Sequence, residues 1–267
     1  MKVAVISDIH GNGAALDAVL ADIDGRGVDA VYCLGDVALQ GPDAARCVDR
    51  LRERAIPTVR GNTDRYLARG GGVPNLSPAE ADAFLRPWRE MLGPERLAWL
   101  EERPERLEVE WEGLRVLLVH GSPRSDEEPL LPWNGAGGGT GGAAGAGPGG
   151  APDPEAEGPL AGVTADLVLF GHHHRQLAWR QDGRWMVGPG SVGMPFDEDP
   201  RAAYALIEVR PTVRPTGRPP ALDIALIRVP YDLEATVAAH RRAGLAEHNP
   251  LFPEQLRQAR QQPRPPR

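Results

Sequence analysis

Short apolar runs that end abruptly in polar residues recur along the first two thirds of the chain. Five of these runs have the length of buried strands: residues 3–6, 31–34, 56–59, 116–119 and 167–170. Helices are expected between the first three runs, near residues 13–25 and 42–54, with Pro42 opening the second. This β-α-β-α-β order predicts a parallel sheet with right-handed crossovers.

The pattern changes in the second part of the chain. Residues 63–101 read as helical, and Ser77 with Glu80 resembles a capping box. Two hairpins are expected next, 105–111 with 114–119, and 176–180 with 184–188 across a turn at Asp182-Gly183. Further strands are expected at 202–209 and 222–229. A second, more antiparallel sheet follows from these strands, and the two sheets must pack their apolar faces together.

Five segments at the ends of the apolar runs hold a concentration of metal-ligating side chains. They are Asp8-x-His10, Gly35-Asp36, Gly61-Asn62, Val119-His120-Gly121 and Gly171-His172-x-His174. The chain has 7 His, and only His240 and His248 lie outside these segments. Because ligands of open α/β sheets bind beyond the carboxyl ends of the strands, the five segments are expected to meet in one pocket. The sequence therefore predicts a metal site.

Composition narrows the functional class. Hydrophobic residues make up 41% and charged residues 25%, which is typical of a globular protein, and the net charge of −7 gives no strong case for a nucleic-acid partner. Two cysteines, Cys33 and Cys47, are too few for a disulfide scaffold. No apolar run is long enough to span a membrane, and the chain enters a strand at once, without a signal-peptide region. We expect a cytoplasmic protein.

The domain is expected to cover residues 1–243. Residues 135–150 form a glycine-rich insert that should be a flexible coil, serving either as an inert insertion or as a mobile lid. Residues 244–267 are rich in Arg, Gln and Pro, and we expect them to be a disordered tail.

The candidate ligands limit the metals and the chemistry. Carboxylate, imidazole and amide ligands suit Mn²⁺, Fe²⁺, Ni²⁺ or Zn²⁺, with manganese the first expectation, and the absence of thiolate argues against a structural zinc site. Seven ligands are too many for one tetrahedral ion, but they suit two ions that share a carboxylate. Such pairs lie about 3.5–4 Å apart and catalyse phosphoryl displacement with a bridging hydroxide as the nucleophile.

These motifs together resemble the calcineurin-like metallophosphoesterases, and most closely their small bacterial and archaeal phosphodiesterase branch. The resemblance rests on Asp8-Ile9-His10-Gly11, Gly35-Asp36, Gly61-Asn62-Thr63-Asp64, His120-Gly121 and Gly171-His172-His173-His174, and extends to Gly190-Ser191-Val192-Gly193 and Asp199-Pro200-Arg201-Ala202. It implies an α/β fold, a four-layer αββα sandwich of two mixed β-sheets flanked by helices, with the site at the edge of the sheets.

The resemblance also implies the role of each site residue. One ion would be held by Asp8, His10, Asp36 and His174, and the other by Asp36, Asn62, His120 and His172. Asp36, which bridges the ions, would form the catalytic group with Asn62, His120 and the bridging hydroxide. His173 would not bind metal. Asn12, Arg65 and Arg124 are candidate substrate contacts.

Position 63 departs from the family pattern. Many members have a histidine there that protonates the leaving group, whereas this chain has Thr63, followed by Asp64 in place to orient such a histidine. The prediction is hydrolysis of small phosphodiesters or activated phosphomonoesters. A phosphoprotein or dinucleoside-polyphosphate phosphatase is the alternative within enzymes. A non-catalytic metal-binding scaffold is the alternative from another class, and the seven intact ligands argue against it. No oligomeric state is predicted.

Overall fold

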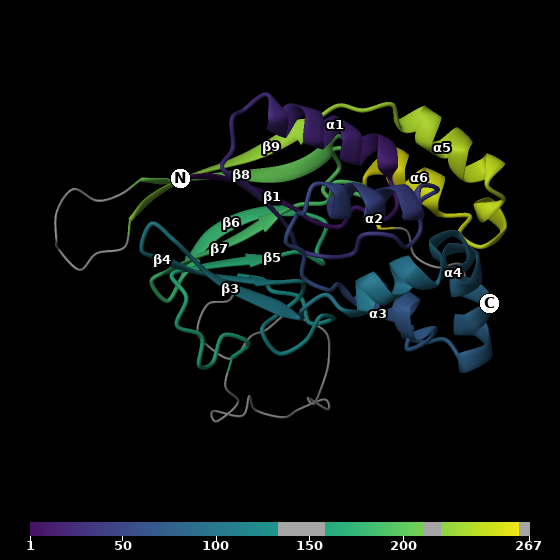
Figure 1. Cartoon of the computed structure of the whole chain (residues 1–267), viewed down its shortest axis with the longest axis horizontal. Helices are drawn as coiled ribbons and strands as arrows, with labels where there is room; N and C mark the ends of the chain where they lie inside the picture. Colours follow the sequence, from purple (N-terminus) through teal and green to yellow (C-terminus); the bar gives the residue numbers. More distant parts are fainter. Residues whose placement is uncertain (133–157, 211–219, 262–267) are drawn as a thin grey trace.

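Two β-sheets packed face to face form the centre of the protein, shown in a computed structural model that describes residues 1–132, 158–210 and 220–261 (Figure 1). The first sheet contains β1 (Lys2–Ile6), β2 (Ala30–Cys33), β8 (Ala202–Arg210) and β9 (Ala221–Val229). The second contains β3 (Arg106–Trp111), β4 (Leu114–Val119), β5 (Leu167–Phe170), β6 (Gln176–Gln181) and β7 (Arg184–Pro189).

Both sheets are mixed. The first has the strand order β2-β1-β8-β9, in which only β1 and β2 are parallel. The second has the order β3-β4-β5-β7-β6, in which β4, β5 and β7 are parallel and the two hairpins form its edges. The hairpin turn at Asp182-Gly183 has positive φ at both residues, as a type I′ turn requires. The two expected hairpins are confirmed.

The faces between the sheets form the inner core. Val3, Val5 and Ile207 of the first sheet pack there against Val116, Leu118, Leu167 and Leu169 of the second, and all of these side chains are buried. These residues alternate along their strands, so the opposite faces need separate covers. Each sheet is therefore apolar on both faces.

Helices cover the outer face of the first sheet and one end of the molecule (Figure 1). They are α1 (Gly13–Asp24), α2 (Ala44–Glu53), α3 (Asn62–Arg69), α4 (Pro78–Glu101), α5 (Leu233–Arg242) and α6 (Phe252–Gln258), with a short 3-10 turn, η1 (Leu245–Glu247). The expected pair of mixed sheets flanked by helices is confirmed. The fourth layer differs, because Leu130 and Leu160 from irregular segments cover the outer face of the second sheet in the described part of the chain.

Three local expectations were wrong in detail. Residues 56–60 run beside β2 but form only a single bridge, from Cys33 to Thr58, and Pro57 has no N–H to extend the pairing. The second helix begins at Ala44 with Asp43 as its N-cap, so Pro42 precedes it. The helical region splits into α3 and α4, because α3 ends at Gly70 in the left-handed conformation, while the capping box of Ser77 that opens α4 is confirmed.

Residues 244–261 are not the disordered tail expected from the composition of the C-terminal segment. Its described residues form η1 and α6, and Phe252 and Leu256 are buried against Val237 and Met194. Two apolar side chains one helical turn apart suffice to dock a short helix on α5. The glycine-rich insert lies outside the described residues. No helix in the described segments has the length and hydrophobicity of a membrane span.

Candidate metal centre

The polar segments predicted to converge lie together at one end of the two sheets. Asp8 and His10 follow β1, Asp36 follows β2, Asn62 opens α3, His120 follows β4, and His172 and His174 follow β5. The loops after β1 and β2 are joined along their backbones, by bonds from Asp8 N to Gly35 O (3.0 Å) and from His10 N to Asp36 O (2.9 Å). The seven side chains thus come from both sheets.

Five of these seven residues adopt a backbone conformation that residues other than glycine rarely adopt. The φ angles lie between 48° and 68° at Asp8, His10, Asp36, His172 and His174. Such strained positions persist only where the surrounding structure enforces them, and they cluster at functional sites. The loops therefore hold these side chains in fixed directions.

Asp8, His10, Asp36 and His174 form the first group, and each offers a ligand atom within 4.8 Å of the others. His10 Nδ1 donates to the Leu39 carbonyl (3.1 Å) and His174 Nδ1 to that of Met194 (2.6 Å). Their Nε2 atoms, 3.1 Å apart, therefore face each other as two lone pairs. Only an electropositive group between them makes this contact favourable. The first group fits a divalent cation.

The second group contains Asp36, Asn62, His120 and His172. His120 Nδ1 donates to the Leu34 carbonyl (2.7 Å), which turns Nε2 toward Asn62 Oδ1 (2.9 Å) and Asp36 Oδ1 (3.4 Å). His172 faces the same Asn62 oxygen with Nδ1 (3.2 Å). Asp36 lies between the groups, because its other oxygen, Oδ2, is 3.6 Å from His10 Nε2.

Burial and mutual charge set the protonation of the site. Burial raises the pKa of Asp8 to about 6 and lowers the pKa of each of His10, His172 and His174 to about 4. Burial also opposes a charge on Asp36, but nearby imidazoles, foremost His120, outweigh it and hold that pKa below its usual value. Neutral imidazoles around a carboxylate are the protonation states that bind metal.

The pKa of His120 shifts the other way. Burial alone would lower it, but the Asp36 carboxylate outweighs burial and raises the pKa to about 10. A proton on this imidazole occupies the place that a metal ligand needs. Binding of a cation at the second group would therefore require loss of this proton.

Asp64 has a different role from the one expected. Its carboxylate accepts hydrogen bonds from the backbone N–H groups of Asp36 (2.9 Å), Val37 (2.9 Å) and Gly61 (3.1 Å). It therefore joins the loop after β2 to the start of α3 and does not orient the side chain at position 63. Thr63 lies beside the ligands, where its N–H donates to Asp36 Oδ1 (2.9 Å), while its hydroxyl has no hydrogen-bond partner among the described residues.

Asn12 is not placed to contact a substrate. It is buried and caps α1, with Oδ1 accepting from Ala15 N (3.2 Å) and Thr236 Oγ1 (3.1 Å). Its amide nitrogen donates to Gly193 O (2.9 Å) and Tyr231 Oη (3.2 Å). These four bonds use the full capacity of the amide.

The two candidate arginines are neutralised by neighbouring acids. Arg65 makes a bidentate contact with Asp126 (2.7 and 3.0 Å) and a further one with Glu127 (2.7 Å). Arg124 is paired on the surface with Glu128. Neither side chain lines the cleft over the ligands. The structure thus gives no support to these two substrate contacts.

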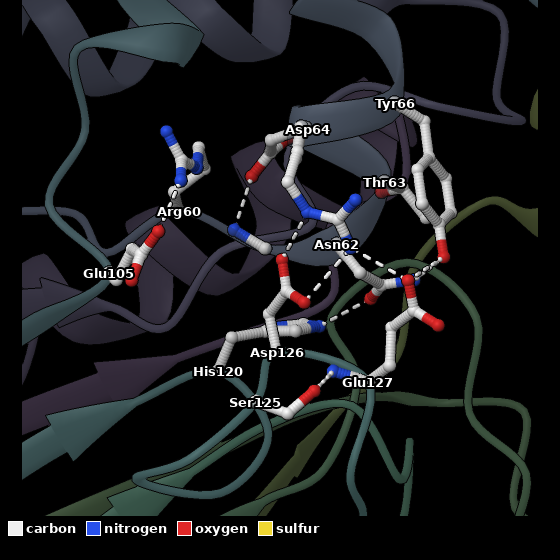
Figure 2. A network of polar contacts seen from close by, with 12 residues as sticks. Arg60, Asn62, Thr63, Asp64, Tyr66, Glu105, His120, Ser125, Asp126 and Glu127 are labelled. Carbon is white, nitrogen blue, oxygen red and sulfur yellow. Dashed lines mark hydrogen bonds and ion pairs between the residues drawn. The ribbon is translucent and has the colours of Figure 1, made fainter. Parts of the chain in front are cut away.

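The sequence pattern did not identify some of the residues that shape the site. Figure 2 shows the clearest case, in which Asn62 Nδ2 donates to the Tyr66 hydroxyl (3.3 Å) and this hydroxyl donates to Glu127 (2.8 Å). Tyr66 lies one helical turn after Asn62, and that spacing is the one signal available in the sequence. The carbonyls of Leu39 and Met194, which orient histidines, carry no sequence signal.

A cleft of about 750 Å³ opens over both ligand groups. Its floor includes His10, Asp36 and His172, and its walls include residues of α4 and the C-terminal segment. His173 also lines this cleft, but its ring lies edge-on to Phe170 and its side chain joins neither ligand group. The arrangement gives a substrate direct access to the ligand atoms.

Comparisons with known proteins agree with this geometry. Residues 1–212 match the calcineurin-like phosphoesterase superfamily domain. An uncharacterized protein of Methanocaldococcus jannaschii is 29% identical over 243 residues, which cover 87% of this chain and 88% of that protein. The crystal structure of a metallophosphoesterase from Sphaerobacter thermophilus has 27% identity and a TM-score of 0.67, covering 97% of this chain and 99% of its own. A hypothetical protein of Pyrococcus horikoshii has 20% identity and a TM-score of 0.72, covering 97% and 98%.

The family match covers most of the chain and spans every predicted metal ligand. The protein therefore belongs to the calcineurin-like phosphoesterase superfamily and is a metal-dependent phosphoesterase.

Proposed function

We propose that this protein hydrolyses phosphodiesters or activated phosphomonoesters with two divalent cations. The first group, Asp8, His10, Asp36 and His174, would hold one ion, and Asp36, Asn62, His120 and His172 would hold the other. The supporting observation is the inward direction of the ligand atoms, above all the two unprotonated Nε2 atoms 3.1 Å apart. When bound, such ions polarise a phosphoryl oxygen and lower the pKa of a water molecule, so that hydroxide is available to attack phosphorus near neutral pH.

The chain's own residues divide the remaining work. Asp36 turns one carboxylate oxygen to each group, so it would bridge the ions and neutralise part of both charges. His120, Asn62 and His172 would hold the second ion, and Asn62 and His172 also line the cleft. Manganese remains our first choice of metal, with iron, nickel or zinc as alternatives for this set of nitrogen and oxygen ligands.

Thr63 sets the proposed limit on substrates. Thr63 lines the cleft at the position where many relatives carry a proton-donating imidazole, and a hydroxyl is too weak an acid to replace that imidazole near neutral pH. A positioned general acid contributes about 10²–10⁴-fold to rate. Esters with acidic leaving groups, such as nitrophenyl esters, should therefore be cleaved far faster than alkyl esters.

A leaving-group series tests this function. Protein reconstituted with Mn²⁺ would be assayed on aryl and alkyl phosphodiesters and monoesters of graded leaving-group acidity. We expect a steep dependence on acidity that flattens in Thr63→His, with Thr63→Val as the control for a change of shape. No turnover of any ester at saturating Mn²⁺ would leave the non-catalytic scaffold as the better explanation. An equal slope in all three proteins would show that another group already supplies the proton.

A further inference from the structure

The cleft over the ligands has one wall that lies outside the family match. Residues 1–212 carry the match, whereas His248, Asn249 and Leu251 of the C-terminal segment line the cleft. This segment is held in place by α6, whose Phe252 and Leu256 are buried. This wall of the cleft is therefore supplied by residues beyond the matched domain.

Two amide side chains meet across this cleft. Asn249 Nδ2 donates to Gln40 Oε1 (3.1 Å), which ties the C-terminal segment to the loop that carries Asp36. Both residues line the cleft, and Gln40 has a φ of 94°, a strained value for a residue with a side chain. Two amides joined by one bond leave an N–H donor on one and a carbonyl acceptor on the other, whichever way round they are turned.

The charge of the cleft limits what lies beside these amides. No arginine or lysine lines it among the described residues, and Glu80 on its wall adds a negative charge. A second phosphate would enter this space without a counter-charge, which is costly for a buried anion. The described lining of the cleft therefore favours a group without a second phosphate next to the reacting one. Phe84 and Phe196 supply apolar walls, and about 750 Å³ is ample for a nucleoside.

We propose that the substrate is a nucleoside ester of phosphate whose base is recognised by Gln40 and Asn249. This inference rests on the phosphoesterase function proposed above. The adjacent donor and acceptor of the paired amides match the adjacent acceptor and donor on a base edge, as in the two-bond contact of asparagine or glutamine with adenine. The base would lie against Phe84, with its phosphate over the ligand groups.

Two p-nitrophenyl diesters with equal charge and the same leaving group provide the test. One is the ester of thymidine 5′-phosphate, and the other is methyl p-nitrophenyl phosphate. In the Mn²⁺-loaded protein, kcat/KM should be about 10- to 100-fold higher for the thymidine ester, the discrimination typical of a two-bond amide contact. Calorimetry should show a matching preference for thymidine 5′-monophosphate over methyl phosphate.

Asn249→Leu should bring both ratios close to one. Gln181→Leu, a change of similar size in β6 away from the cleft, should keep them. If melting curves show that Asn249→Leu unfolds the C-terminal segment, Asn249→Ser removes the amide with a smaller change of shape and should give the same result. Equal rates and equal binding for the two esters would overturn this inference while leaving the phosphoesterase function standing. Turnover of neither ester would overturn the function, and the binding ratio would then decide the recognition of the base.

Discussion

Tyr66→Phe should weaken one metal position and leave the other intact. The hydroxyl of Tyr66 accepts from Asn62 Nδ2 (3.3 Å) and donates to Glu127 (2.8 Å) (Figure 2). Glu127 is itself held by Arg65. This chain of bonds keeps Asn62 Oδ1 directed at the second ligand group. Phenylalanine preserves the buried ring but removes the acceptor of the Asn62 amide N–H, and with it the contact that holds this end of the amide.

Tyr66→Phe should change two quantities, the affinity for the second ion and the free energy of unfolding. Loss of a partner that orients a metal ligand typically lowers metal affinity about 10–100-fold, so the second ion should dissociate more readily by that factor. The free energy of unfolding should fall by about 1–2 kcal/mol, because the Asn62 amide N–H stays buried without an acceptor. Glu127 is half-exposed and can turn to water, so it adds little to that loss.

Metal titration by calorimetry separates these quantities. The variant should keep one tight equivalent of Mn²⁺ and show a second equivalent weakened about 10–100-fold. Tyr204→Phe is the matched control, since the Tyr204 hydroxyl also donates to a carboxylate, Asp22 (2.6 Å), but in a different part of the fold. Equal weakening of both ions, or the same metal isotherm for Tyr66→Phe and Tyr204→Phe, would refute the positioning role.

Three further predictions address other parts of the chain. Asp36→Asn should lower metal content and rate more than any other ligand change, because it removes the charge shared by both groups. His173→Ala should change metal content little. Elemental analysis of both variants checks these two expectations. Burial, with the charge of Arg241 nearby, lowers the pKa of His240 to about 4 from a usual 6.5, so the folded state resists the proton that the unfolded chain binds. Stability should therefore fall as pH drops from 6.5 to 4, and His240→Leu should remove that part of the loss in denaturant titrations. Gly193→Ala should unfold the protein or distort the site, because its Cβ would lie 1.8 Å from the Ile9 carbonyl oxygen, and a melting temperature equal to that of the parent would contradict this.

The sequence was most informative where local pattern and tertiary position coincide. The ligand segments were recognisable because each polar group directly follows a short apolar run, and strand ends of parallel pairs meet at one edge. Composition misled at the C-terminus, where abundant Arg, Gln and Pro hid the two apolar contacts of α6. The Leu39 and Met194 carbonyls were beyond prediction, because any residue supplies a carbonyl and only the tertiary fold brings it to an imidazole.

The ligands of each proposed ion come from loops of both sheets, and this has a consequence for folding. His10 and His174, whose ring nitrogens almost touch, are 164 residues apart in the chain. The first ligand group, which includes both histidines, cannot form until the two sheets have docked. Cations would therefore bind after the slow formation of long-range contacts between the sheets. Metal would then stabilise the native state but not the transition state for folding. It would slow unfolding much more than it speeds folding. The lifetime of the native state would thus increase with the concentration of free metal.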